Sequence, residues 1–333
     1  MIDSVMFWNE PNNQSHWDFH MDPDWIEFSR MVRAAGTLVY ETNPNVRRVM
    51  GGISPIDPAF IEKLREHGAL DAVDVVAVHG FPLDWNYWHA PDDPQDDADT
   101  VPKGIHAWPR KVALAERVAG RPIWATEVGA SSFGGDEMQI YGLRETARYL
   151  RRVERVYWYS LFDLPEWREA TTRHKEAEGS AYYRHYHMGL VDAAGRPKPA
   201  LREWPALGGR MGLCQWFHFE DDATLQRAVQ WFHDLGVQDV RTGLSWADSH
   251  RPGGWDWFDR IAEALRPFRV LATLCFTPPS RGRRPDHTSP PIDHHEFAWF
   301  CAEVVRRYAP PATALPRMES GAVERCLHSG ATP

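Results

Sequence analysis

The chain has 333 residues, and 37 lysines and arginines stand against 46 aspartates and glutamates, which gives a formal net charge of −9. This acidic balance argues against a nucleic-acid partner, whose affinity would come from a basic patch. No apolar segment is long enough to predict a membrane span. No signal peptide is visible, which predicts a cytoplasmic protein, although a trimmed signal would leave secretion open.

Strand-like and helix-like segments alternate along the whole chain. Each strand is a short apolar run, and each helix shows apolar residues at i, i+3 and i+4 spacing. In chain order the predicted strands are 2–9, 46–53, 73–81, 122–127, 155–162, 211–219, 237–246 and 269–276, and the predicted helices are 24–43, 58–68, 105–119, 136–153, 223–235, 255–265 and 293–308.

Eight apolar strands separated by helices are typical of a parallel sheet covered on both faces, and their number predicts a (β/α)₈ TIM barrel. The composition changes only at 189–210, which is rich in Gly, Pro and Arg. Five predicted strands precede this segment and three follow it, so neither side closes a sheet alone. We therefore expect one barrel over 1–309 and an irregular tail at 310–333.

Two glutamates end apolar strands. Glu10 is followed by Pro11, which has no N–H to continue a strand ladder, and Glu127 ends the strand at 122–127. In TIM barrels the chemistry lies at the carboxyl ends of the strands, so the two carboxyl groups are predicted to meet at one mouth. The alternative is that each glutamate is an ordinary solvated loop residue.

Several motifs resemble those of clan A glycoside hydrolases. Phe7-Trp8-Asn9-Glu10-Pro11-Asn12 resembles the strand-four motif, and Ala125-Thr126-Glu127-Val128-Gly129 resembles the strand-seven motif. Tyr157-Trp158-Tyr159-Ser160-Leu161-Phe162-Asp163 is similar to strand eight of family 39, the β-xylosidase-like branch. The resemblance implies strands four to eight in 1–205 and strands one to three in 211–308, which is a circularly permuted order.

The resemblance also implies roles for individual residues. Glu10 would be the acid/base and Glu127 the nucleophile of a retaining glycosidase. Asn9 would bind the sugar 2-hydroxyl, His79 would bind the nucleophile or the sugar, and Arg241 would pair with Glu127. The alternatives are a turn-forming asparagine, a core histidine and a salt bridge at the rim. Phe81 stands where relatives often have a tyrosine near the nucleophile.

Aromatic side chains are expected to stack on the sugar. Trp158 on the predicted eighth strand is the first candidate for such a floor, and further candidates are Trp246, Trp17, Trp85 and Trp88.

Metal and cofactor chemistry are not predicted. The cysteines show no C-x-x-C spacing, and three of them lie in apolar segments, as reduced core residues do. His294-His295-Glu296 lacks the H-E-x-x-H spacing of a metal site, and no nucleotide-binding or serine-hydrolase motif is present.

The predicted substrate is therefore an oligosaccharide, a polysaccharide or a small β-glycoside. The alternative function is a catalytically weak or inactive carbohydrate-binding barrel, because Glu10 stands on a strand that begins at residue 2. Assembly in trans, as a homo-oligomer that exchanges halves, also stays open.

Overall fold

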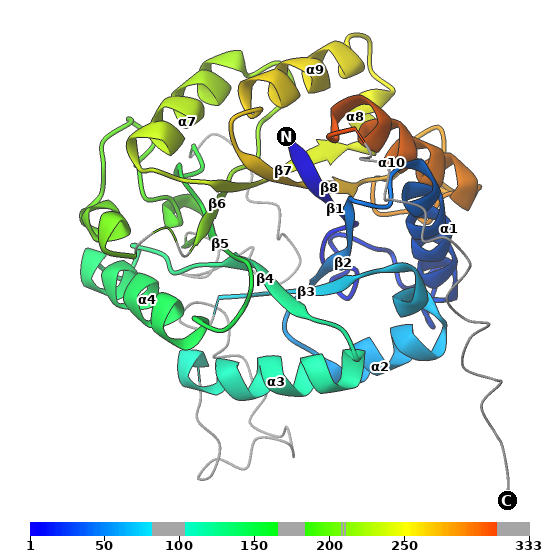
Figure 1. Cartoon of the computed structure of the whole chain (residues 1–333), viewed down its shortest axis with the longest axis horizontal. Helices are drawn as coiled ribbons and strands as arrows, with labels where there is room; N and C mark the ends of the chain where they lie inside the picture. The colour runs from blue at the N-terminus through cyan, green and yellow to red at the C-terminus, as the bar shows by residue number, and fades with distance from the viewer. Residues whose placement is uncertain (82–103, 166–183, 208, 210, 312–333) are drawn as a thin grey trace, which may run out of the picture.

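The computed structural model describes residues 1–81, 104–165, 184–207, 209 and 211–311. Eight strands lie side by side around a closed, wholly parallel barrel with helices around the outside (Figure 1). The strands are β1 (Ile2–Phe7), β2 (Arg47–Ile53), β3 (Val75–Gly80), β4 (Ile123–Val128), β5 (Val156–Tyr159), β6 (Gly212–Cys214), β7 (Asp239–Ser245) and β8 (Arg269–Cys275).

The helices follow the strands in alternation, as the sequence predicts. They are α1 (Ile26–Thr42), α2 (Pro58–Glu66), α3 (Trp108–Ala119), α4 (Asp136–Tyr149), α7 (Asp222–Asp234), α8 (Trp246–Ser249), α9 (Gly254–Ala264) and α10 (His294–Tyr308). Short 3₁₀ helices lie at η1 (Ala69–Ala72), η2 (Gly104–Ala107), η3 (His185–His187) and η4 (Pro199–Leu207).

The barrel closes only with strands from both sides of the 189–210 segment. Before that segment, β5 pairs with β6 after it, with Tyr157 opposite Gly212. The sheet is completed by β1, which pairs in parallel with both β2 and β8. The predicted (β/α)₈ fold is therefore confirmed.

Alternate residues of each strand face two different apolar layers. Inside the barrel, Met6, Ala77, Trp124 and Tyr157 belong to one small cluster of side chains that all come from strands. Their strand neighbours point outward into the larger cluster between the sheet and the helices. Because seven of the eight strands contribute to both layers, the burial of the two layers together stabilises the closed sheet.

The first strand is fixed at its amino-terminal end. The amino group of Met1 donates to the carbonyl oxygen of Phe268 at 2.5 Å. Across the barrel, Arg155 donates to the carboxylate of Asp3 at 2.7 Å. Together with its two strand pairings, these contacts hold the segment that carries Glu10.

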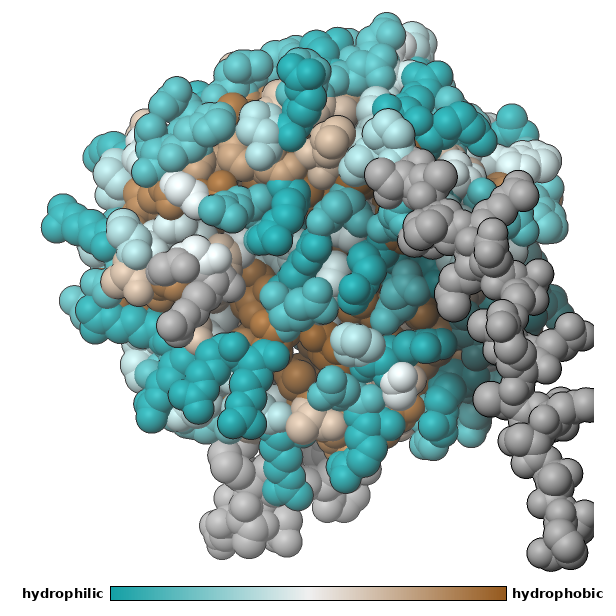
Figure 2. Space-filling view, in the orientation of Figure 1, coloured by the Kyte–Doolittle hydropathy of each residue, from teal (hydrophilic) through white to brown (hydrophobic). Residues whose placement is uncertain are grey.

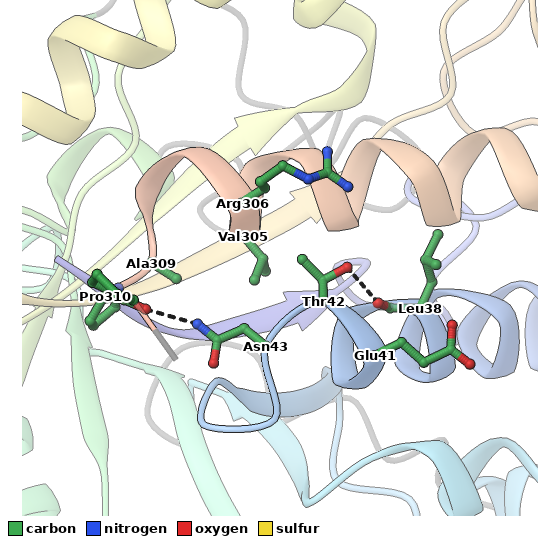
Figure 3. A pocket seen from close by; sticks show the side chains of 9 residues that line it. Leu38, Glu41, Thr42, Asn43, Val305, Arg306, Ala309 and Pro310 are labelled. Carbon is green, nitrogen blue, oxygen red and sulfur yellow. Dashed lines mark hydrogen bonds between the residues drawn. The ribbon is translucent and has the colours of Figure 1, made fainter. Parts of the chain in front are cut away.

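Two surface cavities lie away from the carboxyl ends of the strands. One, of about 450 Å³, lies between the ends of α1 and α10, where Asn43 donates to the carbonyl oxygen of Pro310 at 2.8 Å (Figure 3). The other, of about 410 Å³, is lined by Met1 and Ile2 together with Tyr308 and Ala309. The end of α10 and the start of β1 are therefore neighbours.

The surface and the cysteines are those of an ordinary globular chain. The face in Figure 2 is mostly hydrophilic, with apolar side chains visible between the polar ones. Cys214, Cys275 and Cys301 are buried free thiols, as predicted. Within the described ranges, no helix combines the length and apolar character that crossing a bilayer requires.

Candidate functional site

The chain departs from strand geometry directly after β1, where it presents Asn9 and Glu10. Trp8 and Glu10 have left-handed backbone angles, with φ of 72° and 42°. Such angles at non-glycine residues cost on the order of 1–3 kcal/mol each and persist only where the surrounding contacts determine them. The indole N–H of Trp8, for example, donates to the carbonyl oxygen of His16 at 2.8 Å. This segment is therefore held in a shape that a regular strand would not adopt.

Glu10, His79 and Glu127 meet from the segment after β1, from β3 and from β4. Nδ1 of His79, on β3, lies 3.0 Å from Oε1 of Glu10 and 3.6 Å from Oε2 of Glu127. One ligand atom from each of the three side chains lies within 4.8 Å of the other two. The two carboxyl groups predicted to converge are thus close enough to act on one bond.

Arg241, on β7, joins Glu127 to Asn9. Its Nη1 donates to Oε1 of Glu127, and its Nη2 donates to Oδ1 of Asn9 at 2.7 Å. Its Nε donates to the hydroxyl of Thr273 at 3.1 Å. The guanidinium is fully buried. Burial lowers its pKa, but the charge and hydrogen bond of Glu127, together with those of Cys214, raise the pKa above its ordinary value. Since arginine can only donate, the Asn9 oxygen must face it, which leaves the Asn9 amide nitrogen to point elsewhere.

The second oxygen of Glu10 faces a loop whose residues were not predicted as site residues. Asn13 donates from its amide to Oε2 of Glu10 at 3.2 Å, and Nδ1 of His16 lies 3.7 Å from the same oxygen. Burial lowers the pKa of His16, which favours its neutral form. The only sequence signal was the richness of this loop in Asn and His.

His79 is enclosed on all sides. A Cβ added to Gly52, on β2, would lie only 1.8 Å from Nε2 of His79, so the glycine leaves room for the ring. The side chain is fully buried. Burial lowers its pKa to about 3; the charge of Glu127 opposes this shift and that of Arg241 adds to it. The folded protein therefore holds a neutral imidazole between the two glutamates.

This neutral histidine predicts a loss of stability in acid. The unfolded imidazole, with a pKa of about 6.5, binds a proton that the folded one does not accept until about pH 3. Above about pH 6.5 His79 is neutral in both states and does not lower the free energy of unfolding. As the pH decreases from there toward 3, the free energy of unfolding falls by about 1.4 kcal/mol per pH unit. Denaturant unfolding at pH 7 and pH 5 measures it.

A His79→Gln variant should show a shallower pH dependence of the free energy of unfolding. The matched control is His20→Gln, at an exposed position. An unchanged slope in His79→Gln would contradict the prediction, whatever the absolute stability of the variant.

The structure does not bring Trp158 and Trp246 to the glutamates. Trp158 is fully buried and points outward into the layer beneath the helices. Trp246 is buried against Phe297 and Phe300 of α10. Trp158 lies out of reach because successive strand residues face opposite sides.

Tyr159 is the aromatic residue of β5 that faces the site. It packs against the inner cluster, and its ring centroid lies 5.9 Å from that of Phe81. Burial, followed by the charge of Glu127, raises the pKa of its hydroxyl, which therefore stays protonated. Of the further candidates, Trp17 packs in the core against Trp8 and Phe28, and Trp85 and Trp88 lie outside the described residues.

The glutamates and His79 are also the group that could hold a metal ion among the described residues. Carboxylate oxygens and an imidazole nitrogen are ordinary ligands of Zn²⁺. However, the buried guanidinium of Arg241 already neutralises Glu127 and would repel a second cation. The arrangement fits proton transfer and nucleophilic attack by a carboxylate better than metal binding.

No protein-family model matches this chain, and no curated protein is detectably similar to it. A family 39 glycoside hydrolase from the gut symbiont Bacteroides cellulosilyticus WH2 shares 21% identity over 61% of this chain, with a TM-score of 0.39. This chain spans only 39% of that protein's length.

Two further solved structures resemble the chain. A GH128 exo-β-1,3-glucanase from Cryptococcus neoformans shares 17% identity over 60% of this chain and 68% of its own, with a TM-score of 0.37. An endoglucanase from Pseudomonas stutzeri shares 13% identity over 84% of this chain and 86% of its own, with a TM-score of 0.41.

Proposed function

We propose that this chain is a retaining glycoside hydrolase that cleaves β-glycosidic bonds. The observation that carries the proposal is the close approach of Glu10 and Glu127, whose oxygens lie within 4.8 Å. Retaining enzymes hold their two carboxyl groups about 5–5.5 Å apart, whereas inverting enzymes need about 6.5–9.5 Å to admit a water. The short separation therefore favours the retaining mechanism.

The surroundings of the two glutamates suggest different roles for them. Glu127 contacts the permanent cation of Arg241, as suits a carboxylate that attacks as an anion. Glu10 is surrounded by neutral groups, namely the amide of Asn13 and the imidazoles of His16 and His79. We assign Glu127 as the nucleophile and Glu10 as the acid/base.

The reaction then has two steps. In the first, an oxygen of Glu127 bonds to the anomeric carbon while the glycosidic C–O bond breaks, and the proton of Glu10 passes to the leaving oxygen. In the second, Glu10 takes a proton from a water whose oxygen attacks the anomeric carbon and releases Glu127. Two inversions restore the β configuration.

Asn9 and Tyr159 are the residues we assign to the sugar. The amide nitrogen of Asn9, which faces away from Arg241, would donate to the 2-hydroxyl. Tyr159 takes the part that the sequence predicts for Trp158, an aromatic surface for the C–H face of a sugar ring.

The anomer of the first product tests the proposal. A panel of aryl β-glycosides, followed by proton NMR in the first minutes of reaction, should show β sugar before it mutarotates to the α anomer. An initial α product would refute the retaining mechanism. Saturable binding of sugars without hydrolysis of any glycoside in the panel would instead support the carbohydrate-binding alternative.

The β-xylosidase-like assignment and the permuted strand order are further parts of this proposal. Both rest on the motif resemblances. Superposition on a family 39 enzyme by its catalytic carboxyl groups decides the order. The proposal requires β1 to overlay on strand four, and an overlay on strand one would refute it.

A further inference from the structure

Thr126 is placed against His79 by an irregularity in β4. Val78 of β3 lies opposite Ala125, but the next residue, His79, lies opposite Glu127. Thr126 is therefore an extra residue, and such a β-bulge interrupts the alternation of side chains between the two faces. As a result, two consecutive side chains reach the same imidazole, Thr126 at Nε2 and Glu127 at Nδ1.

The hydroxyl of Thr126 has two partners of unequal strength. Its Oγ1 lies 2.8 Å from Nε2 of His79 and 3.6 Å from the thioether sulfur of Met6. If Thr126 accepted a proton from Nε2, its own hydrogen would be left with the sulfur, which is a weak acceptor. If Thr126 donates to Nε2, its hydrogen goes to a good acceptor and the ring proton resides on Nδ1.

The second arrangement also satisfies the carboxyl groups. A proton on Nδ1 of His79 points between Oε1 of Glu10, at 3.0 Å, and Oε2 of Glu127, at 3.6 Å. An unprotonated Nδ1 would instead attract the proton of Glu10 and hold it away from a leaving group. Fixing the tautomer thus leaves the proton of Glu10 on its other oxygen.

We propose that Thr126 is a positioning residue that fixes His79 as the Nδ1–H tautomer, so that one N–H is shared by the two catalytic carboxyl groups. This inference rests on the proposed function for its catalytic part. As the bond from Glu127 to the anomeric carbon forms and the proton of Glu10 leaves, negative charge moves from Glu127 to Glu10. The Nδ1–H of His79 then donates mainly to Glu10 and less to Glu127, and His79 neither gains nor loses a proton.

The enclosure of the ring supports this assignment. Gly52 on one side and the strands on the other leave the imidazole fully buried, so its partners are the side chains around it. The titratable and charged groups near it are Glu10, Glu127, Arg241 and His16. Because burial lowers its pKa, the imidazole is neutral and carries one proton, on either Nδ1 or Nε2.

The tautomer can be measured without any substrate. In protein labelled with ¹⁵N-histidine, the two ring nitrogens of a neutral imidazole have widely separated shifts that identify the protonated one. The signals of His79 are assigned by their loss in His79→Gln. We expect the Nδ1–H tautomer in the wild-type protein and in Thr126→Ser, and a mixture or the Nε2–H tautomer in Thr126→Val, which keeps the shape but lacks the hydroxyl.

A wild-type protein with Nε2–H, or a Thr126→Val variant with Nδ1–H alone, would overturn the proposal. Thr126→Ala supplies a second variant without the hydroxyl if the valine variant does not fold. In kinetics, both variants should lower kcat about 10–100-fold with little change in KM, and Thr126→Ser should restore it.

The two proposals fail in different ways. A wild-type protein that hydrolyses no glycoside would refute the proposed function, while the nitrogen shifts would still decide what Thr126 does to His79. Normal kcat in Thr126→Val would refute the positioning role even if the tautomer changed.

Discussion

Replacing Glu127 with glutamine is expected to lower kcat on an aryl β-glycoside on the order of 10⁵-fold, the scale of removing a nucleophile from an enzyme that forms a covalent intermediate. The amide keeps the shape of the side chain and can still accept a hydrogen bond from Arg241. The fold should therefore survive, and the loss should fall on the bond-forming step. Stopped assays with an activated aryl leaving group measure it.

Rescue by azide separates the two glutamates. In Glu127→Ala, azide can enter the space of the nucleophile and attack from its side, which should give an α-glycosyl azide. In Glu10→Ala, the covalent intermediate still forms from an activated substrate, and azide then attacks from the opposite side to give a β-glycosyl azide. Glu116→Gln, on the exposed face of α3, is the matched control and should be unaffected. More than a tenth of wild-type activity in Glu127→Gln would contradict the assignment of Glu127 as the nucleophile.

The strand and helix pattern was predictable because the core requires it. Most strands are apolar on both faces, β7 is apolar on its outer face, and every long helix has one apolar stripe, so all eight strands appear in the sequence as predicted. Boundaries were less predictable. The apolar run at 211–219 predicts a long strand, but β6 has only three residues, because its pairing with β5 and β7 ends at Cys214. The side chain of the next residue, Gln215, instead accepts a hydrogen bond from the backbone N–H of Phe162.

Convergence of Asn9, Glu10, His79 and Glu127 was predictable from their places at or near the carboxyl ends of strands. Arg241 lies within β7, and its pairing with Glu127 was predicted from the family resemblance. The direction of each side chain was not. When both faces of a strand are apolar, the sequence does not say which alternate set points inward, and this is why the sequence predicts Trp158 as the stacking residue and misses Tyr159. The bulge at Thr126 and the left-handed angles at Trp8 and Glu10 are departures from regular geometry that no residue pattern predicts.

Replacing Arg241 with methionine is expected to cost about 3–5 kcal/mol of the free energy of unfolding, since it leaves a buried carboxylate without its cation. Both Glu127 and Asn9 lose their principal partner, so activity should also fall by about 10²–10³-fold. Arg241→Lys keeps the charge but has no planar fork to reach both side chains, and it should recover stability more than activity. Chemical denaturation and steady-state kinetics measure the two effects separately.

A double-mutant cycle tells whether this cost belongs to the pair. If the loss in Arg241→Met arises from the uncompensated charge of Glu127, then Glu127→Gln in the same chain should restore part of the stability, and the two changes will not add. Arg117→Met, on the exposed face of α3, should stay within about 0.5 kcal/mol of wild type and controls for loss of an arginine. Additive effects, or a loss below about 1 kcal/mol in Arg241→Met, would mean that the two side chains are independent. In that case Arg241 would be part of the barrel core only, and Glu127 would need another source of the charge that keeps a nucleophile ionised.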